Sequence, residues 1–166
     1  MKKNNELSES LEDYLETILS LEKTVKVARA KDIAEKMGVQ RGSVTSALKN
    51  LAEKELINYE PYSFITLTAK GNKIAREIAS RHSILKDFLV NILQIDNNTA
   101  ESTACKMEHA VDKKTLERMT AFFDFIHSCP RAGKDWVDSF AEFCSKEGKD
   151  LDRCAECFDD CLKRFN

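Results

Sequence analysis

The stretch of sequence that decides the fold is residues 29–56, RAKDIAEKMGVQRGSVTSALKNLAEKEL. It predicts one helix over residues 29–37 and a second over residues 43–56, with a short turn between them. The first helix ends at Gly38, because glycine readily adopts the left-handed conformation in which helices terminate. The second helix carries an apolar stripe at the spacing of one buried face, formed by Val44, Leu48 and Leu51.

The flanking sequence extends this pair of helices into a winged helix–turn–helix. Residues 57–68, INYEPYSFITLT, are typical of two short strands around a turn that contains proline. A helix is expected before the pair, beginning at Ser8 or Ser10 and carrying apolar residues at helical spacing up to residue 22.

The rest of the chain also favours helices. They are expected over residues 72–93, 98–111 and 112–128, and one or two more are expected over residues 134–165. With only five Gly and two Pro, the chain has too few turn residues for a β-sandwich or a barrel. The expected fold class is therefore mainly α.

Charge is distributed unevenly along the chain. The formal net charge is −2, but residues 23–76 hold eleven Lys and Arg against five acids, a net charge of +6. A basic block over a helix–turn–helix is an electrostatic footprint for the phosphates of DNA. Small, hydroxyl and donor side chains at the start of the second helix would allow close approach to base edges and bond phosphates. The predicted DNA-binding residues are Arg29, Gln40, Arg41, Gly42, Ser43, Thr45, Ser46 and Lys49.

The sequence also argues against several classes of protein. Residues 1–10 are polar and charged, unlike a signal peptide, and no apolar run reaches the roughly 18 residues that a membrane span requires. A cytoplasmic protein with no membrane partner is therefore expected. Neither a Gly-rich phosphate loop nor a catalytic triad or zinc-protease motif is present, so an enzyme is not expected.

Side chains that ligate metals occur at helical spacing in two places. Cys105, Glu108 and His109 stand at i, i+3 and i+4, which brings them to one face of a helix. Thiolate, carboxylate and imidazole together suit a first-row divalent metal. Asp13 and Glu16 form a second pair at i, i+3, although acids near a helix N-terminus are also favoured by the helix dipole alone.

Taken in order along residues 7–128, these motifs resemble those of the diphtheria toxin repressor and manganese transport regulator family of metal-dependent repressors. The resemblance rests on EDYLETI at 12–18, DIAE at 32–35, SVT at 43–45, LTAKG at 67–71, Arg81-His82 and Glu108-His109. It implies an N-terminal winged helix joined to a helical dimerisation domain. Metal bound between the two would switch on binding to an operator.

Carried over residue by residue, the resemblance implies six metal ligands: Asp13, Glu16, His82, Cys105, Glu108 and His109. The chain combines two branches of the family, since the manganese branch has Glu in place of Cys105 and the iron branch has Met in place of Asp13. A thiolate favours iron(II), whereas manganese(II) prefers oxygen ligands. Iron(II) is therefore expected first and manganese(II) second. The iron branch also has Glu in place of Lys86, which puts its ancillary site in doubt here.

Beyond residue 128 the resemblance fades, and the sequence becomes rich in cysteine. Five of the six Cys lie there, at Cys129, Cys144, Cys154, Cys157 and Cys161. A C-x2-C-x3-C run with one remote Cys could supply four thiolates to zinc or to an iron–sulfur cluster. The same spacing also fits the apolar face of a docked helix, in which free cysteines pack as small hydrophobes.

Three parts are therefore expected: a DNA-binding domain at residues 1–71, a metal-binding and dimerisation domain at 72–128, and a Cys-rich helical extension at 129–166. The expected function is metal-dependent regulation of transcription, as a repressor that binds a palindromic DNA operator as a homodimer when loaded with iron(II) or manganese(II). The alternative is a redox or iron–sulfur sensor on the same scaffold, which would use the C-terminal cysteines.

Overall fold

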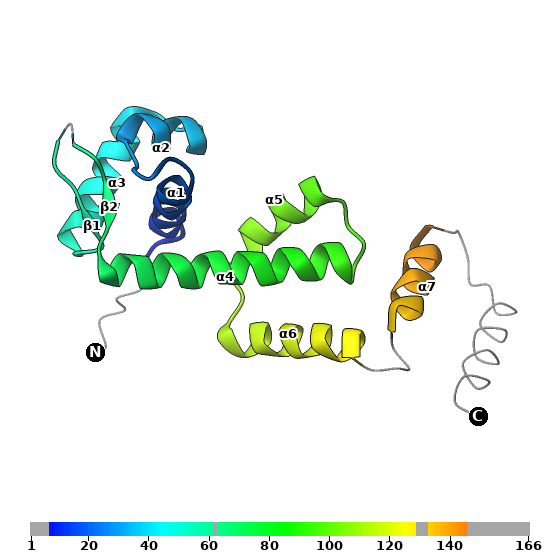
Figure 1. Ribbon diagram of the computed structural model, residues 1–166. Helices are drawn as coiled ribbons and strands as arrows, with labels where there is room; N and C mark the ends of the chain where they lie inside the picture. The colour runs from blue at the N-terminus through cyan, green and yellow to red at the C-terminus, as the bar shows by residue number, and fades with distance from the viewer. Residues whose placement is uncertain (1–6, 62, 129–132, 146–166) are drawn as a thin grey trace, which may run out of the picture. The chain divides into compact units, whose positions relative to one another are not determined.

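The computed structural model describes residues 7–61, 63–128 and 133–145, which are mainly helical, as expected (Figure 1). The elements in chain order are α1 (Glu9–Val25), α2 (Ala30–Met37), α3 (Arg41–Glu53), β1 (Ile57–Asn58), β2 (Thr66–Leu67), α4 (Ala69–Asn91), α5 (Asn97–Met107), α6 (Lys113–Ser128) and α7 (Gly133–Ser145). The chain divides into two compact units, Met1–Ser83 and Ile84–Asn166, and the boundary falls within α4.

Helices α1, α2 and α3 share one apolar core in the N-terminal unit. The predicted stripe of α3 is fully buried there, together with Leu15 of α1 and Ile33 of α2. Burying one Leu or Ile side chain is worth about 1.5–3 kcal/mol. This core therefore fixes how the three helices pack, and it leaves the opposite face of α3 in solvent.

The predicted glycine lies at the turn between α2 and α3. Gly38 ends α2 in the left-handed conformation with φ of +67°, and its N–H donates to the carbonyl groups of Ala34 and Glu35. The prediction of a helix ending at this glycine is confirmed. Helix α2 begins at Ala30 and not at residue 29, because Arg29 is extended and serves as the N-cap.

Helix α3 begins and ends earlier than the sequence predicts. It starts at Arg41, because Gln40 is extended and its carbonyl already accepts the N–H of Ser43 at 3.0 Å. It stops at Glu53, because Glu55 turns the chain with φ of +59°. The change at the start places residues 41 and 42 in the first turn of the helix.

Strands β1 and β2 form the predicted hairpin beside α3, which is called the wing here (Figure 1). They are antiparallel, with Ile57 opposite Leu67 and Asn58 opposite Thr66. The structure adds a bridge that was not predicted, in which Ala28 and Ile65 exchange hydrogen bonds of 2.8 and 3.4 Å. This bridge ties the segment before α2 to the wing.

The wing passes into α4 through a close backbone contact. The N–H of Thr68 donates to the carbonyl of Leu56 at 3.0 Å, and its hydroxyl donates to the carbonyl of Glu55 at 2.8 Å. The same hydroxyl oxygen accepts the N–H of Gly71 at 3.1 Å. A Cβ added to Gly71 would lie 1.9 Å from the carbonyl oxygen of Leu56, so the backbone leaves room only for glycine.

In the C-terminal unit, α5 packs on the last turns of α4. Leu85 and Leu89 of α4 are buried against Ala100 and Ala104 of α5, whose small side chains let the two helices approach closely. Helix α5 ends at Met107, before the predicted end at residue 111. Helix α6 agrees closely with the predicted helix over residues 112–128.

Aspartates cap the helices of this unit. Asp112 accepts the backbone N–H groups of Lys114 and Thr115 and the hydroxyl of Thr115. The bond from the Thr115 side chain, together with the backbone bonds, holds the pKa of Asp112 below its ordinary value. Asp96 caps α5 in the same way, and a hydrogen bond from Thr99 lowers its pKa.

Helix α7 is the last described element. Its Val137 is buried with Ile92 and Ile126, whereas Trp136 and Phe143 are exposed. The predicted helix over residues 134–165 is confirmed as far as residue 145, and the remainder of that prediction lies outside the described residues.

We predict that Gly71→Ala lowers the free energy of unfolding by about 1–3 kcal/mol, because the new methyl group collides with the Leu56 carbonyl. Urea unfolding of the full chain measures this change. Gly42→Ala is the matched control, because a Cβ at residue 42 meets no atom within 4 Å and alanine favours the helix by up to about 1 kcal/mol. Equal unfolding midpoints for the two variants would contradict the prediction.

Candidate DNA-binding surface and metal-binding residues

The predicted DNA-binding residues of α3 lie on its solvent side. Gln40, Arg41, Gly42, Ser43, Ser46 and Lys49 are exposed, and Thr45 is half-buried. The hydroxyl of Thr45 donates to the carbonyl of Arg41 at 3.0 Å, and that of Ser46 to the carbonyl of Gly42 at 3.3 Å. Both hydroxyl groups are held against the helix, where their oxygens can still accept a hydrogen bond.

The N-terminus of α3 is exposed, and its second residue, Gly42, has no side chain. Gln40 makes no side-chain cap hydrogen bond, so the backbone N–H groups of the first turn can bind an anion at the positive end of the helix dipole. A Cβ on Gly42 would meet nothing in the described residues. Packing among the described residues therefore does not require glycine at residue 42.

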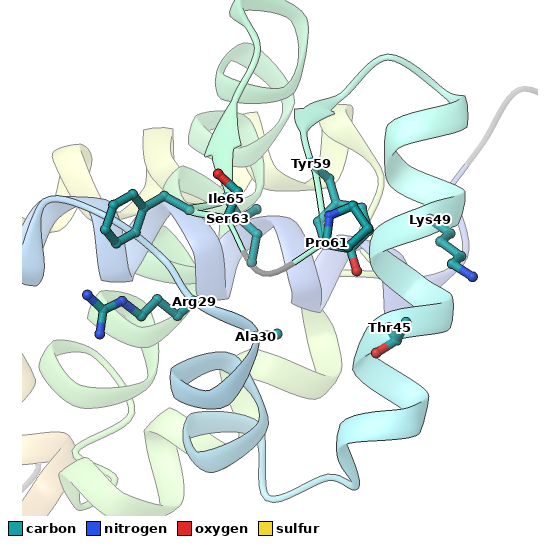
Figure 2. A pocket seen from close by; sticks show the side chains of 9 residues that line it. Arg29, Ala30, Thr45, Lys49, Tyr59, Pro61, Ser63 and Ile65 are labelled. Carbon is teal, nitrogen blue, oxygen red and sulfur yellow. The ribbon is translucent and has the colours of Figure 1, made fainter.

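A groove of about 750 Å³ separates α3 from the wing. Thr45 and Lys49 of α3 line this groove together with the wing residues Tyr59 and Pro61, and Figure 2 shows the Lys49 side chain extending away from the wing. Arg29 and Ala30, at the start of α2, also line the groove. Of the lining residues, Arg29, Thr45 and Lys49 were predicted, whereas Tyr59, Ser63 and Phe64 were not.

The exposed Phe64 explains how the wing takes part in this surface. Its ring is half exposed, and the guanidinium carbon of Arg29 lies 5.0 Å from the ring centroid, within cation–π distance. The bridge between Ala28 and Ile65 brings the two residues together, because each is the direct neighbour of a bridge residue. The signal for this contact in the sequence was Phe64 itself, an apolar residue on a predicted strand beside the proline-containing turn.

The predicted metal ligands of the N-terminal unit come from two helices. Asp13 and Glu16 stand one turn apart on α1, and both are half-buried. His82, on α4, presents a ring nitrogen within 4.8 Å of a carboxylate oxygen of Glu16. The fold therefore brings together two predicted ligands that are far apart in the sequence.

The predicted ligands of the C-terminal unit lie at the end of α5. Glu108 is the C-cap residue and is only 1% exposed, which is rare for a carboxylate that is neither paired nor bound to metal. Its Oε1 lies 3.4 Å from Nε2 of His109. Because α5 ends at Met107, His109 lies in the turn after the helix. Cys105 is one turn earlier on α5 and is exposed.

The chemistry of these donors fits a first-row divalent ion. Carboxylate oxygen and imidazole nitrogen recur in both units, and Cys105 adds a sulfur. Imidazole and carboxylate donors suit iron(II) and manganese(II), and a thiolate shifts preference toward the softer ion. Each unit supplies three of the six predicted donors.

The tail cysteines fall mostly outside the described residues. Cys144 lies on α7 and is exposed. The predicted second metal or cluster site also involves Cys129, Cys154, Cys157 and Cys161, which all lie in the part of the chain that the structure does not describe. That site is therefore untested.

Comparison with known proteins gives matches over both units. Residues 6–65 match the N-terminal DNA-binding domain of iron-dependent repressors, and residues 68–137 match their metal-binding and dimerisation domain. An uncharacterized HTH-type transcriptional regulator of Methanocaldococcus jannaschii is 39% identical over 119 residues, which are 71% of this chain and 95% of that protein. The transcriptional regulator MntR of Escherichia coli O157:H7 is 38% identical over 114 residues, which are 69% of this chain and 73% of MntR.

Solved structures give the same picture. The manganese regulator SloR matches with a TM-score of 0.63 and 30% identity, over 73% of this chain and 56% of SloR. A manganese-dependent transcriptional repressor in complex with manganese matches with a TM-score of 0.64 and 29% identity, over 69% of this chain and 53% of that protein. The chain thus matches little more than half the length of these two proteins.

This chain belongs to the iron-dependent repressor family, whose members are metal-dependent transcriptional regulators that bind DNA and dimerise. The expected family and class of function are confirmed, and the named relatives are regulators of transcription. The comparisons give no support to the iron–sulfur alternative. In the described part of the chain, none of the helices combines the length and hydropathy needed to cross a membrane.

We predict that Phe64→Leu weakens DNA binding several-fold, because leucine keeps the apolar bulk but removes the ring face that holds Arg29. Fluorescence anisotropy with duplex DNA measures the dissociation constant. Phe64→Trp, which keeps an aromatic face, serves as the control and is expected to bind nearly as well as the unaltered chain. Equal affinity of the Leu and Trp variants would show that the ring face plays no part.

Proposed function

We propose that this chain represses transcription by binding a palindromic operator as a homodimer when it is loaded with iron(II) or manganese(II). The proposed ligands are Asp13, Glu16, His82, Cys105, Glu108 and His109. The observation that carries the proposal is the buried Glu108, whose Oε1 lies 3.4 Å from Nε2 of His109, because a carboxylate and an imidazole side by side are donors suited to a first-row divalent ion.

The proposed mechanism follows from the way the donors are divided. Each unit holds three of them, so bound metal could satisfy all six together only if the two units are held in one arrangement. Metal would then select the conformer in which the α3 helices of the dimer match the two half-sites of an operator. The coupling is reciprocal, so operator DNA should tighten metal binding by the same factor by which metal tightens DNA binding.

The metal is proposed from the donor types. The thiol of Cys105 favours iron(II), whereas the carboxylates and imidazoles accept either iron(II) or manganese(II). The matched domains are those of iron-dependent repressors, and the named relatives include manganese regulators. Titration of operator binding under anaerobic conditions with iron(II), manganese(II) and zinc(II), each alone, separates these choices.

The DNA side of the proposal uses the α3 surface and the groove. Arg41 and Lys49 would contact phosphates, while the open first turn of α3 would approach the bases. Because such contacts release counterions, binding is expected to weaken steeply as salt is raised. We propose the division into residues 1–71 for DNA binding, 72–128 for metal binding and dimerisation, and 129–166 as an extension.

We predict that Glu108→Gln and His109→Ala each abolish metal-dependent operator binding, because each removes a ligand that couples the metal to the arrangement of the two units. A gel-shift assay titrated with metal measures this effect. Glutamine preserves the shape of the buried Glu108 side chain, so a correctly folded variant is expected.

Arg41→Ala is the control for these ligand variants. It is expected to weaken operator binding while the metal affinity of the free protein stays near normal, since Arg41 is exposed on α3 and is not among the proposed ligands. The proposed metal site would be refuted if Glu108→Gln and His109→Ala both kept the metal dependence of the unaltered chain.

We also predict that Phe125→Glu converts the dimer into a monomer. Phe125 lies on α6, within the region that matches a dimerisation domain, and its side chain is 54% exposed, as expected for an apolar group that a second copy covers. Sedimentation velocity measures the change. Lys114→Glu, another charge change on an exposed residue of α6, is the control and should stay dimeric. A dimeric Phe125→Glu would place the interface elsewhere.

A further inference from the structure

Helix α7 carries an aromatic face that the described residues leave in solvent. Trp136, Phe140 and Phe143 stand at i, i+4 and i+7, so they lie along one side of the helix. Trp136 and Phe143 are 48% and 55% exposed, and Phe140 is half-buried. Val137, on the neighbouring side of α7, is already buried with Ile126. Helix α7 therefore has a second apolar side, and exposed aromatic side chains grouped in this way are typical of a surface that is covered by a partner.

The sequence that follows α7 has the pattern of an amphipathic helix. Apolar residues and cysteines recur at helical spacing between residues 151 and 165, at Leu151, Cys154, Phe158, Cys161, Leu162 and Phe165. On a helix these six positions fall within about 100° of one another around the axis. The residues between them are mainly charged, and the segment contains neither Gly nor Pro. It therefore has one narrow apolar side that needs a partner surface.

The length of the connection brings this segment back to α7. Helix α7 ends at Ser145, and only residues 146–150, KEGKD, separate it from Leu151. Antiparallel helices are commonly joined by loops of this length, and Gly148 suits the turn. Helix α7 has 13 residues, so the two helices could lie side by side over about 20 Å.

A second copy of the chain is a less suitable cover for this face. The match to a dimerisation domain ends at residue 137, so Phe140 and Phe143 lie beyond it. Phe125 of α6, which we place at the dimer interface, lies within it. A segment tethered through residues 146–150 also has a much higher effective concentration at α7 than a separate molecule has.

We propose that residues 151–165 form a helix that folds back antiparallel on α7 and covers the aromatic face formed by Trp136, Phe140 and Phe143. Phe158, in the middle of the apolar side, would pack near Phe140. The cysteines on that side would serve as small apolar contacts, a role that free cysteine fills well. The inference goes beyond the proposed function, because it assigns the C-terminal extension a structural partner and depends on neither metal nor DNA.

The test uses Trp136, which is the single tryptophan of the chain, so its fluorescence reports on this face alone. Acrylamide quenching of its emission is measured in the full-length chain, with a chelator and a reductant present so that the cysteines hold neither metal nor disulfides. The unaltered chain is expected to be quenched several-fold less than free N-acetyltryptophanamide. Phe158→Asp places a charge in the middle of the apolar side, and it is expected to raise the quenching several-fold and to shift the emission to the red.

Two variants serve as controls and are expected to resemble the unaltered chain. Phe158→Leu keeps an apolar side chain, and Arg153→Asp introduces the same carboxylate on the charged side of the segment. Sedimentation velocity should show that Phe158→Asp keeps the oligomeric state of the unaltered chain, which excludes general unfolding as the cause of the quenching.

Three results would overturn the inference. The first is an unaltered chain quenched as readily as the free tryptophan derivative. The second is unchanged quenching in Phe158→Asp, because the face would then have another cover. The third is an equal rise in Arg153→Asp or in Phe158→Leu, or a rise in Phe158→Asp that accompanies loss of the oligomeric state.

Discussion

The N-terminal unit depends on the contact between Gly71 and the carbonyl of Leu56. With no side chain at residue 71, the first turn of α4 lies directly against the backbone that leads from α3 into the wing. The hydroxyl of Thr68 stabilises this contact, because it donates to the carbonyl of Glu55 and accepts the N–H of Gly71. Ala75 of α4 is buried in the same core as α1, α2 and α3. Farther along α4, His82 presents a ring nitrogen within 4.8 Å of a carboxylate oxygen of Glu16 on α1.

Two different kinds of interaction shape the two functional surfaces. The proposed DNA-binding surface is built within one unit: the core fixes α3, the bridge at Ala28 fixes the wing, and the Phe64 ring contacts Arg29. Such a surface is organised before the ligand arrives. The proposed metal ligands are instead shared between two units. Under the proposal, the ion therefore controls the assembly of these parts and leaves the local structure of each part unchanged.

The sequence predicted the features that depend on local chemistry. Gly38 as a helix end, the buried stripe of α3 and the hairpin of residues 57–68 all follow from neighbouring residues alone. The ends of α3 and α5 were misplaced, because apolar spacing marks the buried face of a helix and does not show where the backbone leaves the helix, as it does at Gln40, Glu55 and Met107. The bridge between Ala28 and Ile65 was not predicted, because it pairs residues that are far apart in the sequence. The positions of Glu16 and His82 along the sequence could not predict that the two side chains lie close together. Only the family resemblance implied that they share a site.

Gly42, on the proposed DNA-binding surface, differs from the core residues in having open space around it. The space around its Cα is open to solvent, and packing within the described residues does not require glycine there. Under the proposed function, enlarging the side chain at residue 42 would therefore change the strength of operator binding with no compensating change in the core.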